Sequence, residues 1–256
     1  MQDLVDRDDI DTLRLDVCDA ASIGGAKEAV QAMTGGELSI LVNCAGGAYI
    51  ARPAIELGDP EDLALFDLNF HAAVRMVTAF APLLLAAGAG AKIVNISSVA
   101  GSVPVPYLGM YGAAKSALNS YGETLRVELS PFGIDVVTVV TGVVSNSKDM
   151  TAFPLKLSPS SPYKPLEETF YKVFVEANSK PVHGSVYARK VVDQALSRRP
   201  RAVWWTGGQA LLGWFLTTFV PRFIVVSPFP PHVFILVRMW GLHRLARARR
   251  RRGKED

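Results

Sequence analysis

The chain has 256 residues, of which 49% are apolar, and this is enough to bury the core of one α/β domain. The formal net charge of +3 is unevenly spread: residues 238–256 hold eight Lys or Arg against two Asp or Glu, so this tail carries +6 and the rest −3. Basicity confined to a tail excludes a nucleic-acid-binding domain, and two cysteines, Cys18 and Cys44, outside metal-ligand spacing exclude a disulfide framework or a cysteine metal cluster.

Short apolar runs alternate with longer helical patterns, as in βαβ units around a parallel sheet. The predicted strands cover residues 12–17, 39–43, 91–97, 134–140 and 202–205. The predicted helices cover residues 22–33, 59–87, 111–130 and 166–197, the last as one helix or two. Asp59 and Pro60 supply an N-cap and a first-turn proline for the second helix. The strands lack polar alternation, so we expect both faces of the sheet to be covered.

An apolar stretch follows the last predicted strand. Residues 203–221 hold no charge, and after Arg222 residues 223–237 are again uncharged. The first stretch is close to the length of about 20 residues that spans a bilayer, but glycines and prolines interrupt the pattern. We therefore expect three parts: a catalytic domain at 1–202, a membrane-associated extension at 203–240 and a basic tail at 241–256. A buried extension over the substrate site or a dimer face is the alternative, and whether the extension spans the bilayer or lies on it stays open.

Tyr111 and Lys115 are four residues apart, which places a phenol and an ammonium on one face of the predicted helix. A free tyrosine has a pKa of about 10, and a neighbouring cation lowers it towards the range where the phenol works as a general acid or base. The third predicted strand ends in Ser97-Ser98, thirteen residues upstream of Tyr111, and ligands bind outside the carboxyl ends of parallel strands. Ser98 is therefore expected to bond the substrate oxygen beside Tyr111. Tyr107 is less suited, since no lysine follows it four residues on.

Several ordered motifs resemble those of the short-chain dehydrogenase/reductase family. Residues 42–47, VNCAGG, resemble its Asn-Asn-Ala-Gly signature, with Cys44 in place of the second Asn. The catalytic pair is carried by IVNISS (93–98) and YGAAK (111–115), which are similar to the family's active-site serine and tyrosine motifs. Asp67-Leu-Asn69 resembles the helix that carries the family's catalytic asparagine.

Leu15-Asp16-Val17 adds a further match, to the strand end whose aspartate contacts the adenine ring. The motifs together cover about residues 12–146. The resemblance implies an α/β, Rossmann-like doubly wound parallel sheet in a nicotinamide-dependent oxidoreductase.

The resemblance also implies a role for each matched residue. Tyr111 is the proton donor in reduction or the acceptor in oxidation, and Lys115 lowers its pKa and bonds the nicotinamide ribose. Ser98 polarises the carbonyl, and Asn69 helps hold a water that relays protons to Lys115. The residues expected to line the cofactor are Asp16, Val17, Asn43, Ala45, Gly46, Tyr111, Lys115, Gly142, Val143 and Asn146.

The segment after the fourth strand departs from the family's pattern. Thr141-Gly142 stands for the usual Pro-Gly and Asn146 for the usual threonine, while the backbone amides near Val143 are still expected to face the nicotinamide carboxamide. With the aromatic-apolar region near the carboxyl end, this variant resembles a narrower group, the fungal NADPH-dependent 1-acyldihydroxyacetone phosphate reductases.

This narrower resemblance implies NADP(H) as cofactor, with NAD(H) not excluded, and 1-acylglycerone 3-phosphate as substrate. It also implies a location on the endoplasmic reticulum or lipid droplets, with the catalytic domain facing the cytosol. The alternatives are a reductase for steroid- or polyketide-like ketones and a cytoplasmic location. The partners expected are a lipophilic small molecule, a membrane surface contacted through 203–256 and a second copy of the chain, but no nucleic acid.

The family's Thr-Gly-x-x-x-Gly-x-Gly turn, which holds the cofactor pyrophosphate, has no counterpart before Asp16. By analogy we expect the first two strands and the first helix of the fold to be missing. The strand at 12–17 would then have no neighbours, and an apolar face would open to water. Two readings remain: a fragment of an ordinary reductase, which we favour, or a truncated, non-catalytic, membrane-bound remnant.

Overall fold

A four-stranded parallel sheet with the order β1-β2-β3-β6 forms the centre of the computed structural model. The strands are β1 (Ile40–Asn43), β2 (Lys92–Ser98), β3 (Asp135–Thr141) and β6 (Val203–Thr206). The predicted parallel α/β sheet is confirmed, and four of the five predicted strands form within two residues of their expected bounds. The structure describes residues 9–145, 155, 157–178 and 180–226.

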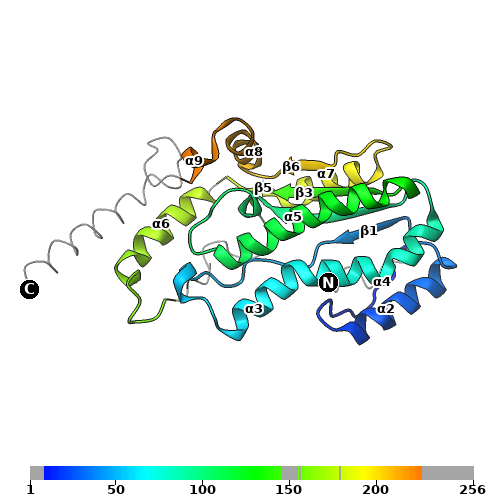
Figure 1. Cartoon of the computed structure of the whole chain (residues 1–256), viewed down its shortest axis with the longest axis horizontal. Coiled ribbons are helices and arrows are strands. Elements are labelled where there is room, and N and C mark those ends of the chain that lie inside the picture. The colour runs from blue at the N-terminus through cyan, green and yellow to red at the C-terminus, as the bar shows by residue number, and fades with distance from the viewer. Residues whose placement is uncertain (1–8, 146–154, 156, 179, 227–256) are drawn as a thin grey trace, which may run out of the picture.

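Helices cover both faces of this sheet (Figure 1). On one face lie α4 (Ala72–Ala87) and α5 (Gly109–Leu129), with α2 (Ala20–Thr34) packed against α4. The other face is covered by α7 (Gly184–Leu196). Neighbouring strand residues alternate between the two layers, since Ile93 packs with α4 and α5 while Val94 packs with α7. The sheet is apolar on both faces, as its sequence predicted, and it is doubly wound.

The helix predicted over residues 59–87 is continuous but contains one wider turn. It begins as α3 (Pro60–Phe66), with Pro60 at the first position as expected. Asp62 accepts hydrogen bonds from the N–H groups of Gly58 and Asp59 at 2.9 and 3.1 Å, which satisfies donors at the helix start. A π-helical turn, η2 (Asp67–His71), then leads into α4. This turn, which the sequence did not predict, carries Asn69.

Residues 12–17, predicted as a strand, form no strand in the structure. In the described part of the chain β1 is the edge of the sheet, and β2 is its one partner. A strand needs a hydrogen-bonded neighbour as well as β propensity, and residues 12–17 have none to join. Leu13 is 44% exposed and Val42 on β1 is 47% exposed, so apolar side chains of this region face solvent, as we expected.

Beyond β3 the chain builds a side wall next to the sheet. β4 (Val144–Ser145) pairs with β5 (Val182–His183) in a small parallel sheet. Between them lies α6 (Glu167–Ala177), so the region predicted as one helix or two is the pair α6 and α7. Short turns of helix complete the connections: η1 (Ala54–Glu56), η3 (Val99–Gly101), η4 (Ser130–Phe132) and η5 (Lys164–Leu166).

The sheet extends past the domain boundary predicted after residue 202, because β6 pairs with β3. Two apolar helices follow, α8 (Ala210–Phe219) and α9 (Arg222–Val225), and residues 227–256 lie outside the described residues. At 10 residues, α8 is shorter than the roughly 20 that span a bilayer. Within the described part, one helical stretch is long and apolar enough to cross a membrane, Pro60–Ala87, and it packs against the sheet.

Candidate active site

Ser98 and Tyr111 meet where the sheet ends and α5 begins. Ser98 is the last residue of β2, and its hydroxyl accepts a hydrogen bond from the N–H of Ala100 at 3.2 Å. Tyr111 is the third residue of α5. Burial raises the pKa of the Tyr111 phenol, and a hydrogen bond with Ser98 acts in the opposite direction without cancelling it. The phenol is therefore held protonated beside the serine.

Lys115 lies one helical turn after Tyr111 and is buried. Its Nζ donates to the carbonyl of Ile96 at 3.0 Å and lies 5.8 Å from the centre of the Tyr111 ring. Burial lowers the pKa of Lys115 to about 8, while a nearby Cys44 charge acts weakly the other way. The site thus holds its cation at an energetic cost.

Asn69 sits in the π-helical turn and is almost fully buried. Its Nδ2 donates to the carbonyl of Leu65 at 2.8 Å and to the carbonyl of Gly47 at 3.0 Å, while its Oδ1 accepts from the N–H of Gly47 at 2.9 Å. Asn69 therefore fixes the backbone loop that follows β1.

Gly46 lies in that loop and faces both Asn69 and Lys115. Its φ is +143°, and a Cβ at this position would come within 2.7 Å of Asn69 Oδ1 and 3.3 Å of Lys115 Nζ. Cys44, Ala45 and Gly46 are exposed. An open strip of backbone next to the buried Lys115 is a shape that fits the nicotinamide half of a dinucleotide.

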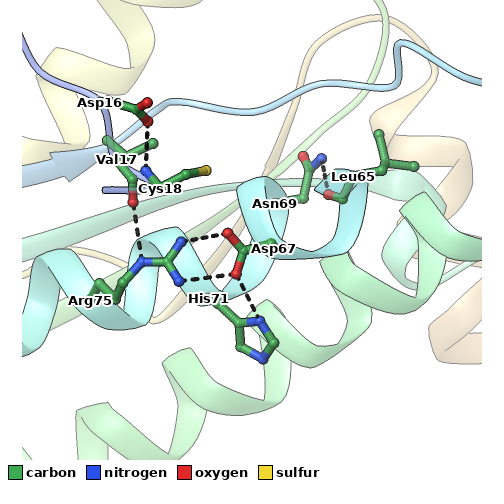
Figure 2. A network of polar contacts seen from close by, with 8 residues as sticks. All are labelled: Asp16, Val17, Cys18, Leu65, Asp67, Asn69, His71 and Arg75. Atoms are coloured by element: carbon green, nitrogen blue, oxygen red, sulfur yellow. Dashed lines mark hydrogen bonds and ion pairs between the residues drawn. The ribbon is translucent and has the colours of Figure 1, made fainter. Parts of the chain in front are cut away.

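Asp16 and Val17 are tied to the long helix through Arg75, as Figure 2 shows. The Arg75 guanidinium donates to the Asp67 carboxylate at 2.7 and 3.0 Å and to the carbonyl of Val17 at 3.2 Å. The hydrogen bond from Arg75 holds the pKa of Asp67 below its usual value. Asp16 Oδ1 accepts from the N–H of Cys18 at 2.8 Å. Although it forms no strand, the predicted adenine-side segment is thus held at a defined place.

The other predicted cofactor residues are placed less favourably. Asn43 uses its Nδ2 to donate to Asn95 Oδ1 at 2.9 Å. The N–H of Val143 donates to the carbonyl of Gly208 at 2.8 Å, and its carbonyl accepts from Gly208 and Val182. The N–H of Val143 itself is therefore engaged in a backbone bridge. That backbone amides near Val143 face the nicotinamide carboxamide stays a prediction. Asn146 lies outside the described residues.

Packing within the chain gives a separate reason for a glycine at position 142. A Cβ there would lie 2.1 Å from the carbonyl oxygen of Gly208. The close approach of these two backbones requires glycine at position 142. Its place in the predicted cofactor site is thus also explained by contact with the chain after β6.

The two neighbouring candidates point elsewhere. Ser97 is buried, and its hydroxyl donates to Asn119 Oδ1 at 2.5 Å. Tyr107 adopts a left-handed backbone with φ of 62°, packs against Phe170 with ring centres 4.3 Å apart, and has its pKa raised to about 12 by burial. The Ser97 hydroxyl also donates to the backbone carbonyl of Lys115 at 3.3 Å. No described interaction joins Ser97 or Tyr107 to the Lys115 ammonium, which agrees with the choice of Ser98 and Tyr111.

One residue near the site belongs to none of the sequence motifs. Tyr187 on α7 shares a hydrogen bond of 2.6 Å with Thr141 Oγ1. Burial raises the pKa of Tyr187, and its hydrogen bond with Thr141 acts in the opposite direction. Thr141 lies opposite Ser98 in the pairing of β2 with β3, so Tyr187 lies close to the site. Because Tyr187 is far from Tyr111 along the chain, only the fold brings the two together.

Apolar and acidic residues line the side of Tyr111 that faces α6. Phe170 and Phe174 of α6 pack in one cluster with Tyr107 and Tyr111. Tyr111 also borders a small cavity, too tight to hold a water molecule, with Arg52, whose guanidinium pairs with the carboxylates of Asp59, Glu61 and Asp62. The one guanidinium lining this cavity is therefore already neutralised.

Comparison with known proteins gives one consistent family. The family model described as short chain dehydrogenase matches residues 1–154. Short-chain dehydrogenase PC-15 from Penicillium crustosum is 36% identical over 230 residues, which cover 89% of this chain and 82% of the relative. The NADPH-dependent 1-acyldihydroxyacetone phosphate reductase of Schizosaccharomyces pombe is 35% identical over 187 residues, 73% of this chain and 62% of that protein.

Comparison of the fold with solved structures points to the same family as comparison of the sequences. A solved short-chain dehydrogenase from Streptomyces avermitilis superposes with a TM-score of 0.70 and 26% identity, covering 83% of this chain and 76% of that one. Members of the family that this model describes use NAD(P)(H) as cofactor. The chain belongs to the short-chain dehydrogenase/reductase family of oxidoreductases.

Proposed function

We propose that the protein is an NADPH-dependent carbonyl reductase that acts on a lipophilic ketone. The observation that carries this proposal is the arrangement of a partly buried phenol, Tyr111, hydrogen-bonded to Ser98 and lying next to the buried ammonium of Lys115. Such a set can bind a carbonyl oxygen and deliver a proton to it.

Each residue has one task in this reaction. When bound, the nicotinamide supplies a hydride to the carbonyl carbon. The Ser98 hydroxyl hydrogen-bonds the carbonyl oxygen, and Tyr111 passes its phenolic proton to that oxygen as negative charge develops there. Lys115 stabilises the phenolate that Tyr111 leaves behind, which makes the proton transfer easier. Because burial raises the pKa of Tyr111, the phenol keeps its proton at neutral pH and is in the form that donates it during reduction.

The described residues supply the nicotinamide half of a cofactor site. Gly46 and Ala45 would let the dinucleotide approach Lys115, and Asp16 and Val17 would lie on its adenine side. Residues 1–15 contain no glycine, so a glycine-rich pyrophosphate turn is not among them. Similarity to the fission-yeast reductase, whose name states NADPH, supports NADPH over NADH.

The same similarity supports 1-acylglycerone 3-phosphate as a substrate. Reduction of its ketone would give 1-acylglycerol 3-phosphate. The aromatic cluster of α6 beside Tyr111 suits an acyl chain, because it offers apolar surface next to the reacting oxygen.

An uncharged ketone of steroid or polyketide type is favoured by a separate observation. A phosphate ester needs a free cation near the site, yet Arg52, which borders the cavity beside Tyr111, is surrounded by Asp59, Glu61 and Asp62. Within the described residues this side of the site is acidic, and it would repel a phosphate.

Steady-state oxidation of NADPH tests these proposals. The substrates are 1-acylglycerone 3-phosphate, its dephosphorylated form 1-acylglycerone, and a fused-ring aromatic ketone. Tyr111→Phe should lower kcat by at least about a hundredfold with every ketone that reacts, while Tyr121→Phe on the same helix keeps normal activity. Retained turnover in Tyr111→Phe would disprove the assigned proton donor. Preference for the dephosphorylated ketone would favour the uncharged class.

A further inference from the structure

Helix α8 lies at the outer edge of the molecule (Figure 1). It presents an apolar face to solvent. Leu211, Phe215 and Phe219 recur every four residues and so lie on one side of the helix, with 71%, 50% and 61% of their surface exposed. Phe223 on α9 continues the surface and is 72% exposed. These four residues, the α8 face, form a cluster rather than scattered single apolar side chains.

The opposite side of α8 is fixed to the catalytic domain. Gly213 lies so close to Val99 and Trp205 that a Cβ there would come within 2.9 and 3.1 Å of their side chains. Arg222 donates to the carbonyl of Ser102 at 2.9 Å. The α8 face is therefore held rigidly next to the η3 turn, which follows Ser98 directly.

The charge pattern of the chain identifies what would cover this surface. No charged residue occurs from 203 to 221, and the sequence beyond α9 is uncharged up to residue 237 and then carries the tail of +6. An apolar surface followed by a cationic segment complements a bilayer with anionic headgroups, where each arginine near the surface contributes about 1 kcal/mol. A second copy would instead bring a second tail of the same charge.

We infer that the α8 face docks on the surface of an anionic lipid bilayer and holds the Ser98 end of the active site towards it. The aromatic rings of Trp214, Phe215 and Phe219, packed together with centres 5.4 to 5.5 Å apart, lie at the interface. A lipophilic ketone then reaches the site from the membrane. This last step rests on the proposed reductase function, whereas the docking does not.

Sedimentation of the full chain with vesicles tests the docking without any turnover. The vesicles are phosphatidylcholine alone or phosphatidylcholine with phosphatidylserine. The unaltered chain should bind the anionic vesicles better, and added salt should weaken this binding. The double variant Leu211→Glu with Phe215→Glu should lose at least about tenfold in affinity, since two apolar contacts become charges. Val192→Glu, an exposed change on α7, is the matched control and should bind like the unaltered chain.

Three results would overturn the inference. Equal binding of the double variant and the unaltered chain would show that the α8 face is not the contact. Equal binding of the unaltered chain to both vesicle types would show that the basic tail does not contribute to binding. If, without vesicles, the unaltered chain is a dimer and the double variant is a monomer, then a second copy covers this face. Unchanged thermal melting of the double variant confirms its folding, and turnover of a water-soluble ketone without vesicles reports on the reductase proposal separately.

Discussion

Asn69 and Gly47 hold each other through two reciprocal hydrogen bonds, from the N–H of Gly47 to Asn69 Oδ1 and from Asn69 Nδ2 to the carbonyl of Gly47. A third bond joins the same Nδ2 to the carbonyl of Leu65. One buried side chain thus connects the loop after β1 to the long helix. The loop that borders Lys115 keeps its shape because of this connection.

Asn69→Ala should lower the free energy of unfolding by about 2–3 kcal/mol, because it leaves the backbone groups of Gly47 and Leu65 without partners. Urea unfolding measures this loss. Because the loop also borders the predicted cofactor strip, the affinity for NADPH should fall in the same variant. A stability equal to that of the unaltered chain would show that water replaces the amide without cost.

Gly46 and Gly47 are adjacent, yet alanine should have opposite effects at these positions. Gly46→Ala places a methyl group 2.7 Å from Asn69 Oδ1 at a φ of +143°, so the loop must shift and NADPH affinity should fall at least about tenfold. Gly47→Ala meets no atom within 4 Å and should bind NADPH nearly normally. Fluorescence titration compares the two, and similar losses in both would contradict the proposed cradle.

Lys115→Met should stabilise the protein at pH 7 while abolishing reductase activity. The folded protein holds a buried ammonium whose pKa is lowered to about 8, and the shift corresponds to roughly 3 kcal/mol. Below pH 8 both folded and unfolded chains carry the proton, so the advantage of methionine is constant. From pH 8 to about 10.5 only the unfolded chain stays protonated, so the unaltered protein gains stability and the advantage shrinks.

Urea unfolding at several pH values measures this trend. Lys190→Met, at an exposed site on α7, is the control. The difference in unfolding free energy between this variant and the unaltered chain should be nearly the same at every pH. A constant difference for Lys115→Met up to pH 10 would show that Lys115 is not held at a lowered pKa.

Arg75→Ala should release the segment that carries Asp16 and Val17, because it removes the bond to the Val17 carbonyl and the pair with Asp67. Limited trypsin digestion, followed by mass spectrometry, should show several-fold faster cleavage after Arg14. Arg126→Ala is the control, since Arg126 on α5 also pairs with a carboxylate, Asp135, and donates to a carbonyl, but both partners lie on β3 and not in residues 12–17. Equal cleavage in both variants would show that the segment is held by other contacts.

The sequence was sufficient where the controlling interactions are local. Alternating apolar runs placed β1, β2, β3 and β6, and the four-residue spacing placed Tyr111 beside Lys115. Pro60 marked the start of the long helix for the same reason, since it acts on its own turn.

Non-local contacts explain what the sequence missed. Residues 12–17 have strand propensity, but a strand also depends on a neighbour that no local pattern reports. The carbonyl of Gly208 accepts the proton of the Val143 amide across the fold, a contact that no pattern near Val143 in the sequence reports. Tyr187 approaches the site from α7, and no sequence motif includes it.

The π turn at Asp67–His71 has a consequence for protein engineering. Deleting one residue there would give a regular helix from Pro60 to Ala87, but it would rotate everything beyond the cut by about 100°. Either Asn69 would swing away from Gly47, or the apolar stripe of α4 would leave the sheet. A search for thermostable variants that favours ideal helices would therefore tend to select against the very irregularity that holds the active-site loop.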